Sequence, residues 1–271
     1  MTPRATRLGI IASALAACCT GAGAPTPPRT WVEPFTAMEF ALVEPGAFEM
    51  GLQNPPGDLR PAPAHPVRLT RPFYLGRFEV TQAQWRRLMD TVPSQFAGCG
   101  DTCPVETVSW LDVQRFIGRL NARDTAEHFR LPTEAEWEYA CRAGSTTRYG
   151  GETDTLRPDL ANYDSRIPFD GVVDTVYVGH PLPVGSYDPN PWGLFDLAGN
   201  VWEWTEDEYC PYGGGRAVDP LGRCGSDTIA IRGGSWAFSA NAARCGRRYT
   251  HHRRDSGYSL GFRLVREAPP E

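Results

Sequence analysis

The sequence predicts a single loop-rich domain that mixes short strands with a few helices. The chain has 271 residues, of which 41% are apolar and 11% aromatic, and this is enough for one large domain with its own core. Its 28 glycines and 25 prolines are scattered without a period, which favours irregular structure over a helical bundle or a collagen-like chain. After residue 40 the sequence contains no internal repeat and no second core, so we expect one domain.

The first half of this domain carries the signals of regular structure. Residues 40–51, FALVEPGAFEMG, alternate apolar and polar side chains around a Pro-Gly turn, which predicts a β-hairpin. Residues 73–90, FYLGRFEVTQAQWRRLMD, predict a strand followed by a helix, with Thr81 placed to cap the start of the helix.

Two further helices are predicted from capping residues and apolar spacing. In 108–123, VSWLDVQRFIGRLNAR, Ser109 caps a helix whose apolar stripe consists of Val113, Phe116, Ile117 and Leu120. In 131–144, LPTEAEWEYACRAG, a capping box is formed by Thr133 and Glu136, and Gly144 ends the helix. From residue 145 onward we expect mostly turns and short strands.

The N-terminus reads as an export signal. Arg4 and Arg7 precede an apolar run, 8–17, that is too short to span a bilayer as a stable helix. The run ends in LAAC, which resembles the bacterial lipobox, so we expect Cys18 to be lipidated and the acyl chains to anchor the protein in a membrane. We divide the chain into a lipoprotein signal peptide (1–18), a Pro/Gly-rich tether (19–37), the domain (38–266) and a tail (267–271).

Composition excludes several functions. The net charge of −5 gives no electrostatic support for a nucleic-acid partner. The sequence has no lysine, and this rules out a Schiff-base lysine and the phosphate-binding lysine of P-loop proteins and kinases.

Six cysteines remain beyond Cys18 and Cys19. An even number in an exported, oxidised chain favours three disulfides. Zinc is the weaker interpretation, because the sequence offers no second short-spaced cysteine pair. For Cys245 the sequence alone leaves three roles open: a catalytic thiol, a metal ligand or half of a disulfide.

Seven ordered motifs over residues 38–266 resemble the formylglycine-generating enzyme family, also called the sulfatase-modifying-factor family. These motifs are PGAFEMG, FYLGRFEVTQAQW, PVETVSW, RLPTEAEWEYACRAG, GLFDLAGNVWEW, RGGSW and LGFRLV. The resemblance implies a single, loop-rich α+β domain with the formylglycine-generating-enzyme fold and a C-type-lectin-like core. It does not by itself establish the activity, because one fold hosts many functions.

The resemblance also indicates where a copper site would lie. Oxidase members of the family bind copper(I) through two cysteines, five positions apart, near the C-terminus, and soft thiolates suit that ion. Counted forward from RGGS these positions are Phe238 and Ala243, and counted back from GFR they fall near Ser235 and Ala240. Because neither register supplies a cysteine, we expect no copper and assign no catalytic residue.

The same resemblance gives Cys245 a structural role. Its position matches a family cysteine that bonds to one in the helix after LPTEAEWEY, which is Cys141 here. Proximity alone then pairs the remaining four, Cys99 with Cys103 and Cys210 with Cys224.

Calcium is the metal that the resemblance implies. Asp196, Gly199, Val201 and Glu203 match the positions where the family binds calcium through side-chain and backbone oxygens, and water completes the shell. On spacing alone the same segment is a Gly199-Asn200 turn followed by a strand with an apolar tryptophan face. A weaker second site, in which Asp170 competes for the acidic position, comprises Asn162, Tyr163, Asp174 and Val176.

The histidines and arginines near the C-terminus favour structural roles. His251 and His252 are adjacent, so in a strand they point to opposite faces and do not ligate one ion. A cluster of arginines suits either an anion or internal ion pairs with the 32 acidic residues, and we favour the ion pairs. The cluster consists of Arg244, Arg247, Arg248, Arg253 and Arg254.

These observations lead to one leading hypothesis and one alternative. We expect an exported lipoprotein of the bacterial cell envelope, in the outer membrane, that binds a protein or small ligand through a face made by Trp202, Ser235, Trp236 and Arg244. The alternative is an oxidoreductase of the formylglycine-generating or nonheme-iron superfamily that acts on a peptide or small molecule without the cysteine pair.

Overall fold

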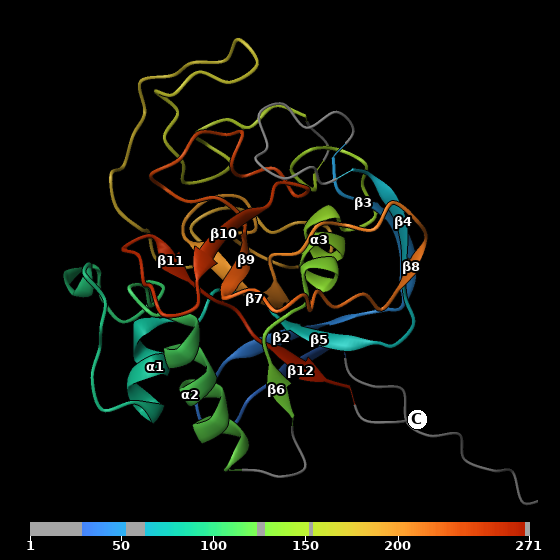
Figure 1. Ribbon diagram of the computed structural model, residues 1–271. Helices are drawn as coiled ribbons and strands as arrows, with labels where there is room; N and C mark the ends of the chain where they lie inside the picture. The colour runs from blue at the N-terminus through green and yellow to red at the C-terminus, as the bar shows by residue number, and fades with distance from the viewer. Residues whose placement is uncertain (1–28, 53–62, 124–127, 152–153, 269–271) are drawn as a thin grey trace, which may run out of the picture.

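In the computed structural model, which describes residues 29–52, 63–123, 128–151 and 154–268, the chain forms three sheets and three α-helices, and its buried apolar side chains form three clusters. Figure 1 shows one sheet in the centre beside α3, a second at one edge, and the third below them next to α1 and α2. Long connections without regular structure fill most of the remainder, as expected from the glycine and proline content. None of the helices in the described part of the chain is long and apolar enough to cross a membrane.

The lower sheet joins segments from both ends of the domain. Its five strands are antiparallel to their neighbours. In spatial order they are β1 (Thr30–Val32), β2 (Glu39–Val43), β5 (Phe73–Gly76), β12 (Val265–Glu267) and β6 (Phe129–Arg130).

Two smaller sheets complete the framework. The central one has the order β10 (Tyr249–His252), β9 (Thr228–Arg232), β7 (Trp202–Glu208) and β11 (Leu260–Gly261). The one at the edge has the order β3 (Gly46–Met50), β4 (His65–Leu69) and β8 (Ala217–Val218).

The predicted hairpin at 40–51 is wrong in its pairing. Both strands form, as β2 and β3, but β2 pairs with β1 and β5 whereas β3 pairs with β4. The Pro-Gly turn therefore passes the chain from one sheet to another. Local alternation predicts a strand but not its partner, because the partner is chosen by burial against distant segments.

The helices begin where their capping residues predict. α1 (Gln82–Leu88) and α2 (Trp110–Asn121) have complete capping boxes at Thr81 and Ser109. α3 (Glu134–Arg142) has one at Thr133, with Glu136 as its other member. α3 ends at Arg142, and the left-handed C-cap is Ala143, one residue earlier than Gly144, whose φ is also positive. The buried residues of α2 are Val113, Phe116, Ile117 and Leu120, as expected.

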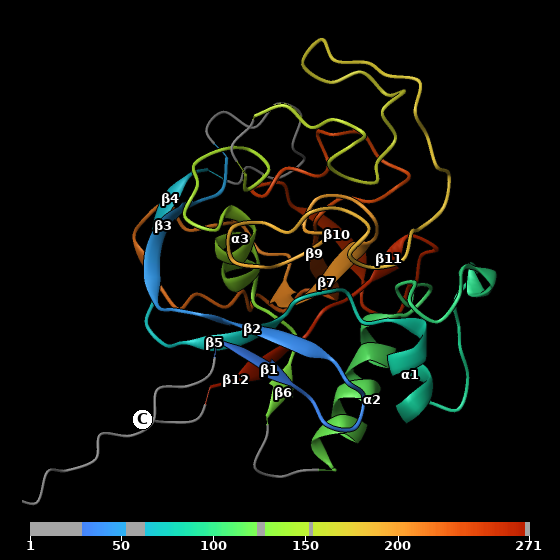
Figure 2. The same ribbon diagram turned by 180° about the vertical axis from the view of Figure 1, so that it is seen from behind.

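The domain begins earlier than the sequence predicts. β1 lies within the predicted tether 19–37 but pairs with β2 from Thr30 to Val32. Trp31 packs against Phe40, with their ring centroids 5.6 Å apart. Both ends of the described chain therefore meet in the lower sheet, opposite the long yellow loop that projects from the domain in both views (Figures 1 and 2).

Candidate functional site

The six cysteines of the described residues are all in disulfides. The structure pairs Cys141 with Cys245 at a Cα–Cα distance of 5.6 Å, which is the pair that the family resemblance implies. The other two pairs, Cys99–Cys103 and Cys210–Cys224, have Cα–Cα distances of 5.9 and 6.0 Å. Cys245 is fully buried and its sulfur is in a disulfide, so it is not a free thiol. Its role in the disulfide-bonded protein is therefore structural.

The first candidate calcium loop contains a buried ion pair. Glu203 on β7 is fully buried, and both of its carboxylate oxygens accept 2.7 Å hydrogen bonds from Arg263. The indole N–H of Trp137 donates to the same carboxylate at 2.7 Å. Asp196 has a left-handed backbone (φ 56°), and its carboxylate accepts from the Gly185 N–H at 2.7 Å.

Gly199 is required where this loop crosses the second candidate site. Its φ is 90°, and a Cβ atom at this position would lie 2.2 Å from the Asn162 carbonyl oxygen. Only glycine adopts this conformation so close to another backbone. The Gly199 N–H donates to the Gly233 carbonyl at 2.8 Å, which ties the loop to the RGGSW motif.

Glu79 is not among the site residues predicted from the sequence, although it lies in the FYLGRFEVTQAQW motif. Glu79 is fully buried and accepts from the Val201 N–H at 3.0 Å and from the Asn200 side chain at 2.6 Å. Burial, together with the charges of Asp196 and Glu203, raises the pKa of Glu79 well above its ordinary value. Burial also raises the pKa of Asp196 to about 6. No pattern within the motif distinguishes this glutamate from a surface residue.

Two buried carboxylates, Glu79 and Glu203, and the partly buried Asp196 thus lie near one guanidinium, that of Arg263, which pairs with Glu203. An excess of buried negative charge is stabilised by a proton or a cation. Hydrogen-bonded carboxylates keep lone pairs for a metal, so the donor set fits a hard cation such as calcium.

The second candidate calcium site contains an unsatisfied acceptor. Asn162 is 2% exposed, and its Oδ1 has no hydrogen-bond partner. Its Nδ2 donates to the Asn200 Oδ1 at 3.2 Å, which connects this site to Glu79 and the first one. Asp174 is nearby on the loop, and its carboxylate accepts from the Val176 N–H at 3.3 Å, while the Val176 carbonyl accepts from Ser165. A buried amide oxygen without a donor is a suitable ligand for a cation.

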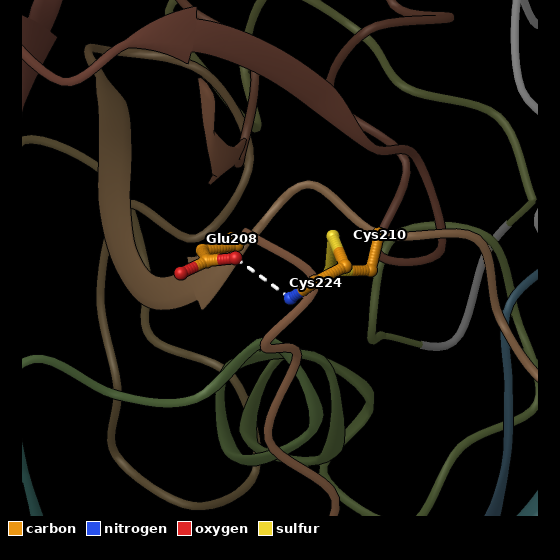
Figure 3. Close-up of side chains that lie close together, drawn as sticks. All are labelled: Glu208, Cys210 and Cys224. Carbon is orange, nitrogen blue, oxygen red and sulfur yellow. Dashed lines mark hydrogen bonds between the residues drawn. A yellow bond between two sulfur atoms is a disulfide. The ribbon is translucent and has the colours of Figure 1, made fainter. Parts of the chain in front are cut away.

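A third group contains residue types that can bind a metal but does not form a metal site. Within the described residues, the ligand atoms of Glu208, Cys210 and Cys224 lie within 4.8 Å of one another. However, Figure 3 shows the two sulfurs joined in a disulfide, and the Glu208 carboxylate accepting from the Cys224 N–H at 2.7 Å. A disulfide offers no thiolate to a metal.

The prediction of the ligand-binding face is wrong, because its residues do not lie at the surface. The four residues assigned to it are all buried, with exposures of 3%, 1%, 6% and 6% for Trp202, Ser235, Trp236 and Arg244. They lie inside because β7 and the RGGSW segment pack within the core. Arg244 also lies apart from the others, because its guanidinium stacks 5.5 Å from the Phe169 ring centroid.

The exposed residues of this region are aromatic and cover the two tryptophans. Phe238 and Tyr249 both lie 5.5 Å from Trp202, and Tyr258 lies 5.6 Å from Trp236 (ring centroids). Phe238, Tyr249 and Tyr258 are 37%, 43% and 48% exposed. We call these three residues the aromatic surface.

Of the C-terminal arginines, Arg248 forms an internal ion pair and Arg253 forms one with an exposed acid. Arg248 pairs with Glu134 in the interior, where its Nε lies 2.7 Å from the carboxylate. Arg253 pairs with Asp227 at 3.1 Å. His251 and His252 lie on strand β10, where His251 packs edge-on against Trp204.

The fold and the cysteine pairing define a disulfide-stapled, loop-rich α+β domain. The chain belongs to the family of the sulfatase-modifying factor enzyme 1-like domain, whose family model matches residues 30–268. It is 36% identical over 200 residues to the formylglycine-generating enzyme of Streptomyces coelicolor, covering 70% of this chain and 60% of that protein. It is 31% identical over 176 residues to the inactive C-alpha-formylglycine-generating enzyme 2 of Bos taurus, covering 62% and 52%.

A solved structure supports the same fold. Treponema denticola variable protein 1 superposes with a TM-score of 0.76 at 25% identity, covering 89% of this chain and 100% of that one. The chain spans 60%, 45% and 45% of the length of three formylglycine-generating enzymes that it matches.

Proposed function

We propose that this protein is a lipid-anchored binding module of the cell envelope that has lost the copper-dependent oxidation of its family. The observation that carries the proposal is the state of the cysteines. All six in the described residues are in disulfides, and the two alternative registers of the copper site are occupied by Phe238 and Ala243 or by Ser235 and Ala240. Copper(I) requires soft ligands, and these side chains supply none.

Two further observations favour binding over catalysis. The bovine relative shows by its name that members without activity exist in this family. The aromatic surface presents large side chains that suit a protein or small-ligand partner, because aromatic residues are enriched in binding interfaces. The buried Trp202 and Trp236 support this surface from below through the contacts described above.

Copper uptake and peptide oxidation test the loss of activity. The purified full-length chain is given copper(I), oxygen and a cysteine-containing peptide, with the Streptomyces coelicolor enzyme as the positive control. We expect neither copper binding nor conversion of the cysteine to formylglycine. Turnover of the peptide by this chain would overturn the proposal and support the oxidoreductase alternative.

Co-purification from native membranes tests the binding role. We expect a partner that is retained by the unchanged protein and lost when Tyr249 and Tyr258 are replaced by alanine. Replacement of the exposed Val218, which is 56% exposed on β8, is the matched control and is expected to leave the partner bound. If the tyrosine variant and the Val218 variant retain the partner equally, the aromatic surface is not the binding site.

Membrane anchoring rests on Cys18, which lies outside the described residues. We propose that the LAAC boundary is the lipidation site and that calcium, held by the two candidate sites, stabilises the exported C-type-lectin-like fold. In Cys18→Ser we expect the mass of the mature protein and its share in the membrane fraction to change. An unchanged mass and an unchanged membrane fraction would contradict the lipid anchor.

A further inference from the structure

A cavity of about 420 Å³ lies apart from the aromatic surface. It is bordered by β4, β8, the start of α3 and the end of β7, and it is covered by the loop that leads from Cys210 to Cys224. This cover is closed at its base by the Cys210–Cys224 disulfide, which Figure 3 shows beside Glu208. The apolar part of the wall is formed by Met50, Ala135, Pro211, Ala217, Pro220 and Leu221.

Two buried carboxylates line this cavity, and of these Glu134 is paired with arginines whereas Asp207 is not. Asp207 is 5% exposed and lies in the cavity lining. Its two oxygens accept from the backbone N–H groups of Glu134, at 2.8 Å, and Gly222, at 2.6 Å. Burial, followed by the charge of Glu134, raises the pKa of Asp207 to about 7. Among the described residues Asp207 forms no ion pair, and the charge of the nearby Arg248 lowers its pKa by less than burial and Glu134 raise it.

The neighbouring guanidinium groups are committed to other acids. Arg248 donates to Glu134 and, through Nη1, to the Cys210 carbonyl at 2.9 Å. Arg232, fully buried, bridges Glu134 and Glu138 at 3.1 and 2.9 Å. Arg142 also pairs with Glu138, at 2.7 Å, so three arginines meet these two glutamates. Asp207 is the acid of this group that forms no ion pair, although the charge of Arg248 lowers its pKa.

A second acceptor lies in the same lining. His65 is 4% exposed, and its Nδ1 lies 3.0 Å from the Pro63 carbonyl. A carbonyl only accepts, so Nδ1 is the donor in this contact, and in that tautomer Nε2 is an acceptor. The ring packs edge-on against Tyr212, whose hydroxyl is occupied by Glu134 and Arg232.

We propose that this cavity binds a small organic ammonium ion, with its nitrogen on Asp207 and its hydrocarbon part against the apolar wall. A mostly apolar pocket with a few convergent polar groups is the usual form of a small-molecule site. The Asp207 carboxylate, which forms no ion pair, and the His65 acceptor select a cationic donor over an anion. The site does not depend on the aromatic surface or on the fate of the copper cysteines.

Titration calorimetry with three matched probes tests this assignment. The full-length protein is titrated at pH 8 with n-hexylammonium, n-hexanol and hexanoate, which share a chain and differ in the polar end. We expect n-hexylammonium to bind about tenfold or more tightly than n-hexanol, because a hydrogen bond to an ionised partner is the stronger one. Hexanoate is expected not to bind. Equal affinity for the amine and the alcohol, or binding of none of the three, would overturn the proposal.

Two substitutions locate the site. Asp207→Asn is expected to reduce the affinity for n-hexylammonium to that of n-hexanol and to leave n-hexanol binding unchanged. The control Asp90→Asn removes an acid that is 90% exposed and remote from the lining, and it is expected to change neither. If Asp207→Asn does not fold, Ala217→Phe is tested instead, because its larger side chain fills the cavity from β8. Loss of n-hexylammonium and n-hexanol binding in Ala217→Phe supports the location of the site, and retained n-hexylammonium binding refutes it.

Discussion

Arg263 and Glu203 form a buried, doubly hydrogen-bonded ion pair that joins the C-terminal LGFRLV motif to strand β7. Both side chains are fully buried, and the Nε–Oε2 and Nη2–Oε1 distances are both 2.7 Å. Arg263 also donates to the carbonyls of Gly76, at 3.1 Å, and Phe195, at 2.9 Å. A single guanidinium thus connects the lower sheet, the candidate calcium loop and the central sheet.

Removal of this guanidinium is expected to destabilise the domain strongly. Arg263→Met leaves Glu203 buried without its partner, and breaking a buried pair in this way costs about 3–5 kcal/mol of unfolding free energy. Urea unfolding followed by tryptophan fluorescence measures the loss. Arg86→Met is the control, since Arg86 is half-exposed and its pair with Asp101 contributes about 0–1 kcal/mol. Similar effects of the two substitutions would contradict the central role of the buried pair.

The Cys141–Cys245 disulfide is expected to contribute more stability than the Cys99–Cys103 disulfide. The first closes a segment with a sequence separation of 104 and the second one of 4, and longer loops lose more entropy in the unfolded chain. Replacing Cys141 and Cys245 by alanine should cost about 2–5 kcal/mol. Guanidinium chloride unfolding of both double-alanine variants gives the comparison. A larger loss for the short loop would show that strain or native contacts outweigh chain entropy.

Because of Asp207, the unfolding free energy of the protein is expected to fall as pH rises. Its pKa in the folded protein is raised to about 7, so between the ordinary carboxyl pKa of about 4 and pH 7 the folded state holds a proton that the unfolded chain has released. The contribution of Asp207 is therefore fully present below pH 4 and lost by about pH 7. Unfolding free energies of the unchanged protein and Asp207→Asn, measured across this range, should converge or cross as pH rises. A constant difference would disprove the raised pKa.

Calcium is expected to raise the thermal unfolding midpoint, and a chelator should reverse the change. An ion that binds only the folded state stabilises it in proportion to the logarithm of its concentration. Asp196→Asn and Asn162→Ala each remove one candidate ligand, from the first and the second site respectively. Scanning calorimetry with calcium should show a smaller shift for these variants. Asp227→Asn, whose side chain is 74% exposed, is the matched control and should respond like the unchanged protein.

Local signals in the sequence predicted the helices and the class of fold. Thr81, Ser109 and Thr133 mark helix starts because a cap satisfies backbone groups no more than three residues away. The apolar stripe of α2 follows from the helical repeat alone. The pairing of Cys141 with Cys245 came from the family resemblance rather than from any local pattern, since an even number of cysteines leaves many pairings open.

The tertiary structure decided the partners and the exposure of each segment. The two strands of residues 40–51 join different sheets, and Trp202, Ser235 and Trp236 lie beneath the aromatic surface instead of forming it. Glu79 meets Asn200 across 121 positions of sequence, and Glu134 meets Asp207 across 73. Strand partners, burial and the pKa of a carboxyl group depend on what distant segments place around it. The sequence by itself therefore determined which elements form and where they begin, while only the packed chain determined which charges are buried together and which side chains reach the surface.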